Sequence, residues 1–171
     1  KSSLKRLKNN NIDISKIESG LVELQYDDIN INELLNELYD LYSESCSRKN
    51  ISLEINKQLS KNEVYCSTDA NKLQQILSIL VDNAIKFTGS GGISIFYNMK
   101  DNMLEFAVKD TGVGIENKDL DIVFDRFRQA DDRSTREFGG TGLGLAIAKA
   151  FVNKLGGEIW LESARSNRCK S

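Results

Sequence analysis

Apolar residues recur at helical spacing in the N-terminal part of the chain. A first helix is expected over 1–19, ending at Gly20, because glycine is common just beyond helix C-termini. Asn32 can cap a second helix that continues to about Arg48, since an asparagine side chain accepts hydrogen bonds from free backbone N–H groups. The residues of this helix that are expected to face the core are Leu34, Leu35, Leu38 and Leu41.

A longer amphipathic pattern follows in the middle of the chain. Asp69 is a good N-cap for a helix that stops near Thr88 and Gly89, where glycines break the pattern. Further helices are expected at 118–124 and at about 143–155. The residues of the long helix that are expected to face the core are Leu73, Ile76, Leu77, Leu80 and Ala84.

Alternating apolar and polar residues predict the strands. These are expected at 51–55, 93–100, 103–109 and 158–161, with a further extended segment at 21–31. Only two residues separate 93–100 from 103–109, so these segments should pair as a hairpin, and Trp160 is interpreted as a core residue. This mixture favours an α+β fold: a two-layer α/β sandwich with a mixed, mainly antiparallel sheet and helices on one face.

Composition narrows the possible functions. The 171 residues have a net charge of −2, which gives no basic footprint for nucleic acid, so no nucleic-acid partner is expected. The longest apolar runs fall short of the roughly 18–20 residues that span a bilayer. Three widely spaced cysteines indicate a reducing compartment, and the chain contains no histidine. A protein of one ordinary domain plus a short appendage is expected.

The segment D-T-G-V-G, Asp110–Gly114, follows a predicted strand and is a candidate for reading a nucleotide base. A carboxylate at Asp110 can accept a hydrogen bond from the exocyclic amine of adenine. Guanine presents a carbonyl oxygen at that place and would leave the carboxylate unpaired. Glycine at Gly112 and Gly114 permits positive φ angles and a close approach to the base. An aspartate that caps a tight turn is the alternative interpretation.

Ile79, Asn83 and Lys86 share one stripe of the long predicted helix. The amide oxygen of Asn83 is the kind of hard ligand that Mg²⁺ prefers. Lys86, one turn later, can neutralise phosphate charge. The alternative is an exposed polar stripe of an amphipathic helix.

A glycine-rich segment, G-G-T-G-L-G-L, covers Gly139–Leu145 just before the helix expected at 143–155. The free N–H groups of a first helical turn favour phosphate oxygens, and the glycines would let the segment open and close as a lid. A flexible connector is the alternative interpretation. Phe124 and Phe127, which precede this segment, belong either to the core or to a dock for a partner helix.

In combination, these motifs resemble the catalytic ATP-binding domain of bacterial sensor histidine kinases. The resemblance rests on the order N-A-I-K-F-T, D-T-G-V-G-I, F-D-R-F and G-G-T-G-L-G-L, and it covers about Ile31 to Leu161. The segment F-R-Q-A-D-D-R-S-T-R-E-F further resembles hybrid kinases, and I-D-I-S-K-I-E-S-G looks like the end of a dimerisation helix. The resemblance implies that 1–20 is part of the second dimerisation helix and that 21–171 is a catalytic domain of the Bergerat ATPase type.

The resemblance also implies ATP and Mg²⁺ as ligands and gives roles to individual residues. Asp110 would bind adenine, in a loop shaped by Gly112 and Gly114. Asn83 would hold Mg²⁺, and Lys86 would contact phosphate. The F-x-x-F segment would touch the dimerisation helices. The residues of the ATP lid would be Gly140, Thr141, Gly142, Leu143 and Gly144.

The implied activity is that of an ATP-dependent protein-histidine kinase in a two-component pathway. In this family the γ-phosphoryl group passes to a histidine on the dimerisation helix of the same protein, and then to an aspartate of a response regulator or receiver domain. No catalytic residue is expected in this chain, because the phosphoacceptor histidine is absent. The full-length parent would be a homodimer, with this domain in the cytoplasm as the intracellular part of a membrane-anchored sensor.

Some positions depart from the family pattern. Ile79 stands where the family often has another asparagine, Lys8 and Asn11 are polar where the dimerisation helix is usually apolar, and S-A-R-S-N-R-C-K-S replaces the last strand. Two other functions stay open at this point. One is a clamp ATPase of the DNA-repair, topoisomerase or chaperone kind, and the other is an interaction module that is insensitive to nucleotide.

Overall fold

The computed structural model describes most of the chain between residues 22 and 163, with gaps at 58–63, 102, 121 and 126–141. The chain divides into two compact units: Gln25–Val113, and Gly114–Ser171 together with Lys1–Leu24. The helix expected over 1–19 lies outside the described residues. The domain boundary at residue 20 therefore stays a prediction.

A three-stranded sheet forms the frame of the unit Gln25–Val113. Its strand order is β2–β4–β5, with bounds Ile51–Lys57, Gly91–Lys100 and Met103–Asp110. β2 runs parallel to β4, while β4 and β5 form the expected antiparallel hairpin, in which Ile93 pairs with Asp110. Asp110 is thus the last residue of β5, at the strand end that the sequence predicts.

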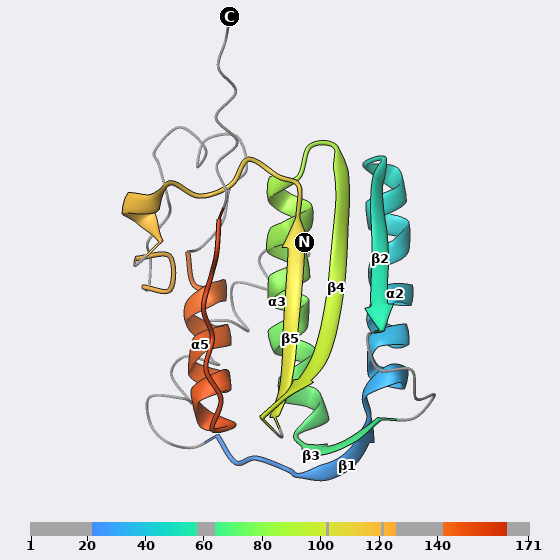
Figure 1. Ribbon diagram of the computed structural model, residues 1–171, viewed down its shortest axis with the longest axis vertical. Coiled ribbons are helices and arrows are strands. Elements are labelled where there is room, and N and C mark those ends of the chain that lie inside the picture. The colour runs from blue at the N-terminus through green and yellow to red at the C-terminus, as the bar shows by residue number, and fades with distance from the viewer. Residues whose placement is uncertain (1–21, 58–63, 102, 121, 126–141, 164–171) are drawn as a thin grey trace, which may run out of the picture. The chain divides into compact units, whose positions relative to one another are not determined.

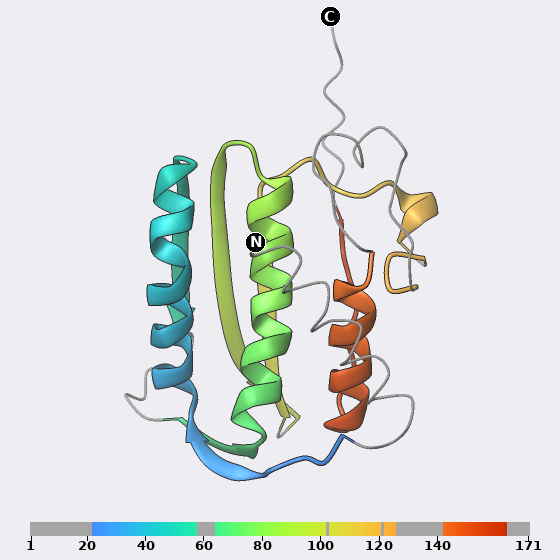
Figure 2. The same cartoon turned by 180° about the vertical axis from the view of Figure 1, so that it is seen from behind.

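Two long helices cover one face of this sheet. α2 spans Ile31–Arg48 and α3 spans Ala70–Phe87, and both lie behind the sheet in Figure 1 and in front of it in Figure 2. A short antiparallel ribbon of β1 (Asp27–Asn30) and β3 (Tyr65–Thr68) completes the unit. The predicted α+β architecture, with a mixed sheet and helices on one face, is therefore confirmed.

The core lies between the helices and the sheet. On α2 the buried stripe continues from Leu38 to Tyr42, one turn later, whereas Leu41 is 59% exposed. The expectation that Leu41 faces the core is therefore wrong, and Tyr42 takes the position. The main buried cluster contains Ile31, Leu34, Leu35, Leu38, Tyr42, Val64, Leu73, Leu77, Val81, Ile95 and Tyr97.

The first turn of α2 differs from the prediction. Asn30, and not Asn32, is the N-cap, and its side chain accepts a hydrogen bond of 3.0 Å from the Asn32 N–H group. Asn32 is buried, and its Oδ1 accepts a 2.7 Å hydrogen bond from the hydroxyl of Tyr97, a fully buried residue of β4. Asn32 is therefore a core residue that satisfies the polar end of a buried tyrosine.

The N-cap predicted for α3 is confirmed. The Asp69 side chain accepts hydrogen bonds of 3.0 Å from the N–H groups of Lys72 and Gln25. Gln25 lies just ahead of β1, so one buried carboxylate joins the start of this unit to the start of α3. The strand β3 is absent from the prediction because Y-C-S-T has no clear alternation of apolar and polar residues.

The unit that contains Gly114–Ser171 is less regular. α5 spans Gly144–Lys154 and confirms the helix expected at 143–155, but the helix expected at 118–124 is only a 3-10 turn, Asn117–Asp119, followed by turns. Residues 158–161 form no strand, and Trp160 is 57% exposed, so both of these predictions are wrong. Alternation shows which residues share a face, but a strand also needs a partner for its backbone groups.

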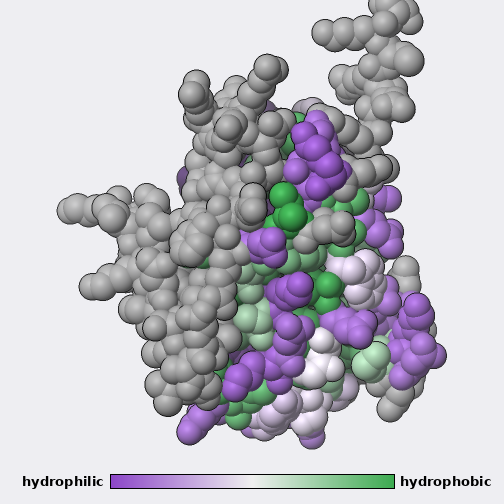
Figure 3. Space-filling model, turned by 90° about the vertical axis from the view of Figure 1, so that its left-hand side faces the viewer, coloured by the Kyte–Doolittle hydropathy of each residue, from purple (hydrophilic) through white to green (hydrophobic). Residues whose placement is uncertain are grey.

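Some large hydrophobic side chains of the described residues are exposed, among them Tyr39, Leu41 and Trp160. Seen from one side, hydrophobic residues show between hydrophilic ones (Figure 3). Single exposed apolar residues of this kind are common on folded proteins. Among the helices that the structure describes, none is both long enough and apolar enough to cross a membrane.

Candidate functional site

Asn83 and Lys86 lie one turn apart near the C-terminal end of α3, and both side chains are half-buried. The Nζ atom of Lys86 lies 4.5 Å from the centroid of the Phe87 ring. Burial lowers the pKa of the Lys86 ammonium group, because a charge is less favourable away from water. The same partial desolvation strengthens the attraction of this charge to an anion such as phosphate.

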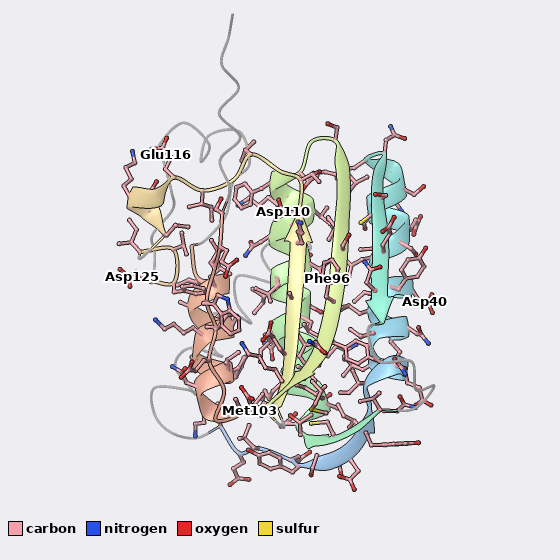
Figure 4. All side chains as sticks on the ribbon, viewed as in Figure 1. Asp40, Phe96, Met103, Asp110, Glu116 and Asp125 are labelled. Atoms are coloured by element: carbon pink, nitrogen blue, oxygen red, sulfur yellow. The ribbon has the colours of Figure 1, made fainter. Side chains whose placement is uncertain are left out.

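Asp110 is exposed at the end of β5 (Figure 4) and opens a tight turn. Its Oδ1 accepts a 2.8 Å hydrogen bond from the N–H group of Gly112. The turn-capping role that was the alternative interpretation of Asp110 is therefore present. It does not compete with base recognition, since a carboxylate accepts several hydrogen bonds and this one orients it.

The loop after Asp110 is attached to two other elements. The Val113 N–H group donates to the carbonyl of Phe87 at the end of α3, over 3.3 Å. Thr111 binds the start of β4: its N–H donates to the Gly92 carbonyl (3.1 Å), its Oγ1 accepts from the Gly92 N–H (3.0 Å) and its hydroxyl donates to the Ser90 carbonyl (3.1 Å). These bonds bring the Asp110 loop and the end of α3 together.

Glycine is required at Gly112 for a steric reason. A Cβ there would lie 2.5 Å from the carbonyl oxygen of Phe87 and 2.7 Å from Oδ1 of Asp110. The φ angle of Gly112 is not in the left-handed region, so the conformational reason expected for this glycine is wrong. It applies to Gly114 instead, which has a φ of 69°.

The segment predicted to be the lid is described only at its end. Gly140 and Thr141 lie outside the described residues, as does Phe127. Gly142 has a φ of 67°, and Leu143 is the buried N-cap residue of α5, which makes no side-chain cap hydrogen bond. Gly144 is the first residue of α5, so the glycines lead directly into a helix N-terminus, as expected.

Phe124 of the F-x-x-F pattern is half-buried. The Nζ atom of Lys149 on α5 lies 5.5 Å from the centroid of its ring, within the range of a cation–π contact. Phe124 thus packs within its own unit. Its contact with a dimerisation helix stays a prediction.

The predicted site residues divide between the two units. Asn83, Lys86, Asp110 and Gly112 belong to Gln25–Val113, and the lid residues and Gly114 to the other unit. Sequence reasoning missed the role of Thr111 in attaching the Asp110 loop to β4. Its place inside D-T-G and the glycines around the start of β4 were the available signals. A cavity of about 440 Å³ lies between α2 and β2, but none of the predicted nucleotide-binding residues lines it.

A metal ion at this site would depend on single protein oxygens rather than on a cluster of ligands. Within the described part of the chain, no three His, Cys, Asp or Glu side chains gather closely enough to hold one. Mg²⁺ commonly keeps several waters and binds one or two protein oxygens plus substrate phosphates. An amide oxygen from Asn83, half-buried on α3 beside Lys86, fits that mode of binding.

Comparison with known proteins identifies the family and the fold. Residues 68–170 match the family described as histidine kinase-, DNA gyrase B- and HSP90-like ATPase. The autoinducer 2 sensor kinase/phosphatase LuxQ of Vibrio vulnificus (strain YJ016) is 39% identical over 95% of this chain and 19% of its own length. The hybrid signal transduction histidine kinase D of Dictyostelium discoideum is 35% identical over 94% of this chain and 11% of its own length.

Solved structures give the same result. Full-length ShkA in complex with AMPPNP has a TM-score of 0.79 and 26% identity, over 94% of this chain and 34% of that chain. The histidine kinase ThkA in complex with the response regulator protein TrrA has a TM-score of 0.72 and 26% identity, over 96% of this chain and 46% of that chain.

The chain belongs to this ATPase family, as the ATP-binding catalytic domain of a two-component sensor histidine kinase. The predicted family, fold type and enzyme class are confirmed, and both relatives named above are sensor kinases rather than clamp ATPases. The chain spans about a fifth of the length of LuxQ, which is a much longer protein.

Proposed function

We propose that this chain binds ATP together with Mg²⁺ and supplies the γ-phosphoryl group to a histidine on a dimerisation helix of the same protein. The observation that carries the proposal is the attachment of the Asp110 loop to Phe87. It joins the predicted base-reading carboxylate to the end of the helix that bears Asn83 and Lys86. A preorganised frame of this kind suits phosphoryl transfer, in which positioning and charge neutralisation provide most of the catalysis.

Each residue of this frame has a proposed role. Asp110 accepts a hydrogen bond from the exocyclic amine of adenine, and Gly112 and Gly114 shape its loop. Lys86 neutralises phosphate charge. Asn83 holds Mg²⁺, which when bound adds further positive charge at the phosphates.

The lid contains the remaining nucleotide-binding residues of the proposal. Backbone N–H groups at the start of α5 face phosphate oxygens, which helix N-termini favour. Leu143 at the N-cap position has an apolar side chain, which offers no oxygen that would compete with an anion there. The proposed lid residues are Gly140, Thr141, Gly142, Leu143 and Gly144.

The partners follow from the chemistry that the chain lacks. The chain has no histidine, so the phosphoacceptor belongs to another part of the parent protein. Residues 1–20 are the last part of the second dimerisation helix of that parent. The parent is a homodimer that passes the phosphoryl group to a response regulator or receiver domain, and this domain lies on the cytoplasmic side. The complex of ThkA with TrrA supports the regulator as a partner.

Calorimetric titration tests nucleotide binding first. ATP and GTP are each titrated with and without Mg²⁺, and we expect ATP to bind more tightly with Mg²⁺ and GTP to bind at least tenfold more weakly than ATP, since guanine leaves a polar group unpaired. Asp110→Asn should remove the preference for ATP. An Asp110→Asn chain that binds ATP as well as the parent contradicts the assignment of the pocket.

Phosphoryl transfer is tested with γ-³²P-labelled ATP and a supplied dimerisation domain that carries the acceptor histidine. We expect acid-labile label on that domain only when this chain and Mg²⁺ are present. The matched control is the same domain with its histidine replaced by glutamine, which should stay unlabelled. ATP binding without transfer to any histidine-bearing domain tried contradicts the kinase part of the proposal.

A further inference from the structure

Thr88 ends α3 and has a side chain that the nucleotide-site prediction did not use. It is the C-cap residue of the helix and is 1% exposed, and its N–H group donates to the carbonyl of Ala84 over 3.0 Å. Its hydroxyl oxygen is buried and has no hydrogen-bond partner among the described residues. Buried hydroxyl groups are almost always paired, so an unpaired one needs an explanation.

The position of Thr88 connects it to the base-reading loop. The peptide bond between Phe87 and Thr88 supplies the carbonyl that accepts from the Val113 N–H group. A Cβ on Gly112 would lie only 2.5 Å from the oxygen of this same carbonyl. The unpaired hydroxyl and the loop of Asp110 are therefore neighbours of one peptide group.

The phosphate-binding group on α3 points elsewhere. Lys86 precedes Thr88 by two residues, and residues two apart in a helix project from different faces. Thr88 follows Ala84, a buried residue, at a spacing of four and continues the buried face of the helix. The Thr88 side chain thus lies on a different face of α3 from the phosphate-binding group proposed at Lys86.

We infer that the Thr88 hydroxyl is a further nucleotide-binding group: because its oxygen is buried, the side chain rotates on binding to meet the purine base, directly or through one ordered water. This inference rests on the proposed function. A hydroxyl both donates and accepts a hydrogen bond, which suits the edge of a purine, where donors and acceptors alternate. Valine has nearly the same shape and would fill the buried position without an unpaired polar atom, so the hydroxyl lowers the stability of the nucleotide-free fold.

Two threonines with opposite surroundings give the test. Thr88→Val removes an unpaired hydroxyl and should leave the free energy of unfolding unchanged or raise it in urea denaturation without nucleotide. Thr111→Val is the matched control: the Thr111 hydroxyl bonds to both Gly92 and Ser90, so its loss should destabilise the chain. If Thr88→Val destabilises the chain as much as Thr111→Val, the hydroxyl already has a partner within the protein and the inference is overturned.

Titration calorimetry then measures the role in binding. Thr88→Val should weaken ATP binding about fivefold, the value of one hydrogen bond, and Thr88→Ser should restore the affinity. ADP should lose the same factor as ATP, because both carry the base. A loss confined to ATP would place Thr88 at the phosphate end and overturn the assignment to the base.

The two levels of the proposal fail in different ways. A folded parent chain that binds no ATP contradicts the proposed function, and the inference with it. A parent that binds ATP while Thr88→Val binds it equally well overturns the inference alone. Unchanged or raised stability together with weaker binding of both nucleotides supports it.

Discussion

α3 and α5 both border segments that carry nucleotide-binding motifs, yet their ends are fixed in different ways. α3 is fixed at both ends: the Asp69 side chain caps its first turn, and the loop after Asp110 is attached to its last residue, Phe87. α5 starts at Leu143 without a side-chain cap, and each of its ends lies beside a glycine with a positive φ angle. The helix that bears Asn83 and Lys86 is fixed at both ends, whereas the N-cap residue of α5 makes no side-chain cap hydrogen bond.

Under the proposed function, the difference would let one small domain combine rigid base recognition with a movable lid. Discrimination between bases needs fixed polar groups, because a mobile carboxylate would adapt to the wrong base. A lid has to open for nucleotide exchange, and an uncapped helix start preceded by glycines costs little to rearrange. The following variants break or sharpen this contrast, from the largest expected effect to the smallest.

Gly112→Ala should have the largest effect. The new methyl group would meet the Phe87 carbonyl at 2.5 Å, so the loop must leave the end of α3, and we expect a loss of about 2–3 kcal/mol in the free energy of unfolding together with loss of ATP binding. Gly89→Ala is the matched control, because a Cβ there has nothing within 4 Å. Equal stability of the two variants in urea denaturation would show that the loop is not fixed to α3.

Asp69→Ala should have the second largest effect, a loss of about 1–2 kcal/mol in the free energy of unfolding. The substitution removes a buried carboxylate that accepts hydrogen bonds from two N–H groups. Asp40→Ala, on the exposed side of α2, is the control and should change stability little. Thermal unfolding at neutral pH compares the two.

The contribution of Asp69 should also depend on pH. Burial by itself raises the pKa of this carboxyl, but hydrogen bonds from the Gln25 and Lys72 N–H groups and the charge of Lys72 outweigh burial, so the pKa is lowered. A folded-state pKa below the unfolded value of about 3.9 means that the stabilisation is complete above that pH and is lost as the pH falls through the folded-state pKa. The difference between parent and Asp69→Ala should be constant from about pH 5 to 8 and shrink in more acidic solution; a difference that grows on acidification contradicts this.

Gly142→Ala and Gly156→Ala form a matched pair at the two ends of α5. The φ angles are 67° and 78°, so each substitution should cost about 1 kcal/mol of stability through backbone strain. Gly142 alone belongs to the proposed lid, so Gly142→Ala should in addition weaken ATP binding in calorimetric titration. Equal affinities for the two variants would argue against a lid at this end of α5.

Lys154→Met should have the smallest effect. The Nζ atom of Lys154 donates a 3.2 Å hydrogen bond to the carbonyl of Val22, but the side chain is exposed, so we expect a change of at most about 0.5 kcal/mol. Lys100→Met, another exposed lysine, serves as the control in urea denaturation. A loss above 1 kcal/mol would show that this end of α5 is held more firmly than its contacts indicate.

Local chemistry explains which parts of the fold could be predicted. The cap at Asp69 and the β4–β5 hairpin depend on residues close in sequence, and both were found. The cap of α2 was misplaced because I-N-I-N offers two asparagines with the same local chemistry. The choice depends on Tyr97, which is distant in sequence and needs Asn32 as its partner in the core.

The candidate site shows the same division. The motif residues Asn83, Lys86 and Asp110 stood out because their side-chain chemistry is readable from the sequence. The steric need for glycine at Gly112 could not be read from the sequence, because the atom that excludes a Cβ there is the carbonyl oxygen of Phe87 on another element. Thr88 was visible only as the end of N-A-I-K-F-T, because the sequence gives no sign that its hydroxyl is buried and lacks a partner among the described residues.

The strand order of the sheet has a consequence for how the chain folds. β4 and β5 are joined by a tight turn. β2 pairs in parallel with β4, which brings residue 51 beside residue 91, and the chain between these two strands contains β3 and α3. Closing so long a loop is slow compared with forming a hairpin. We expect amide protection in pulsed hydrogen exchange to arise in β4 and β5 before β2, so that the strand carrying Asp110 is among the first parts of the molecule to become ordered.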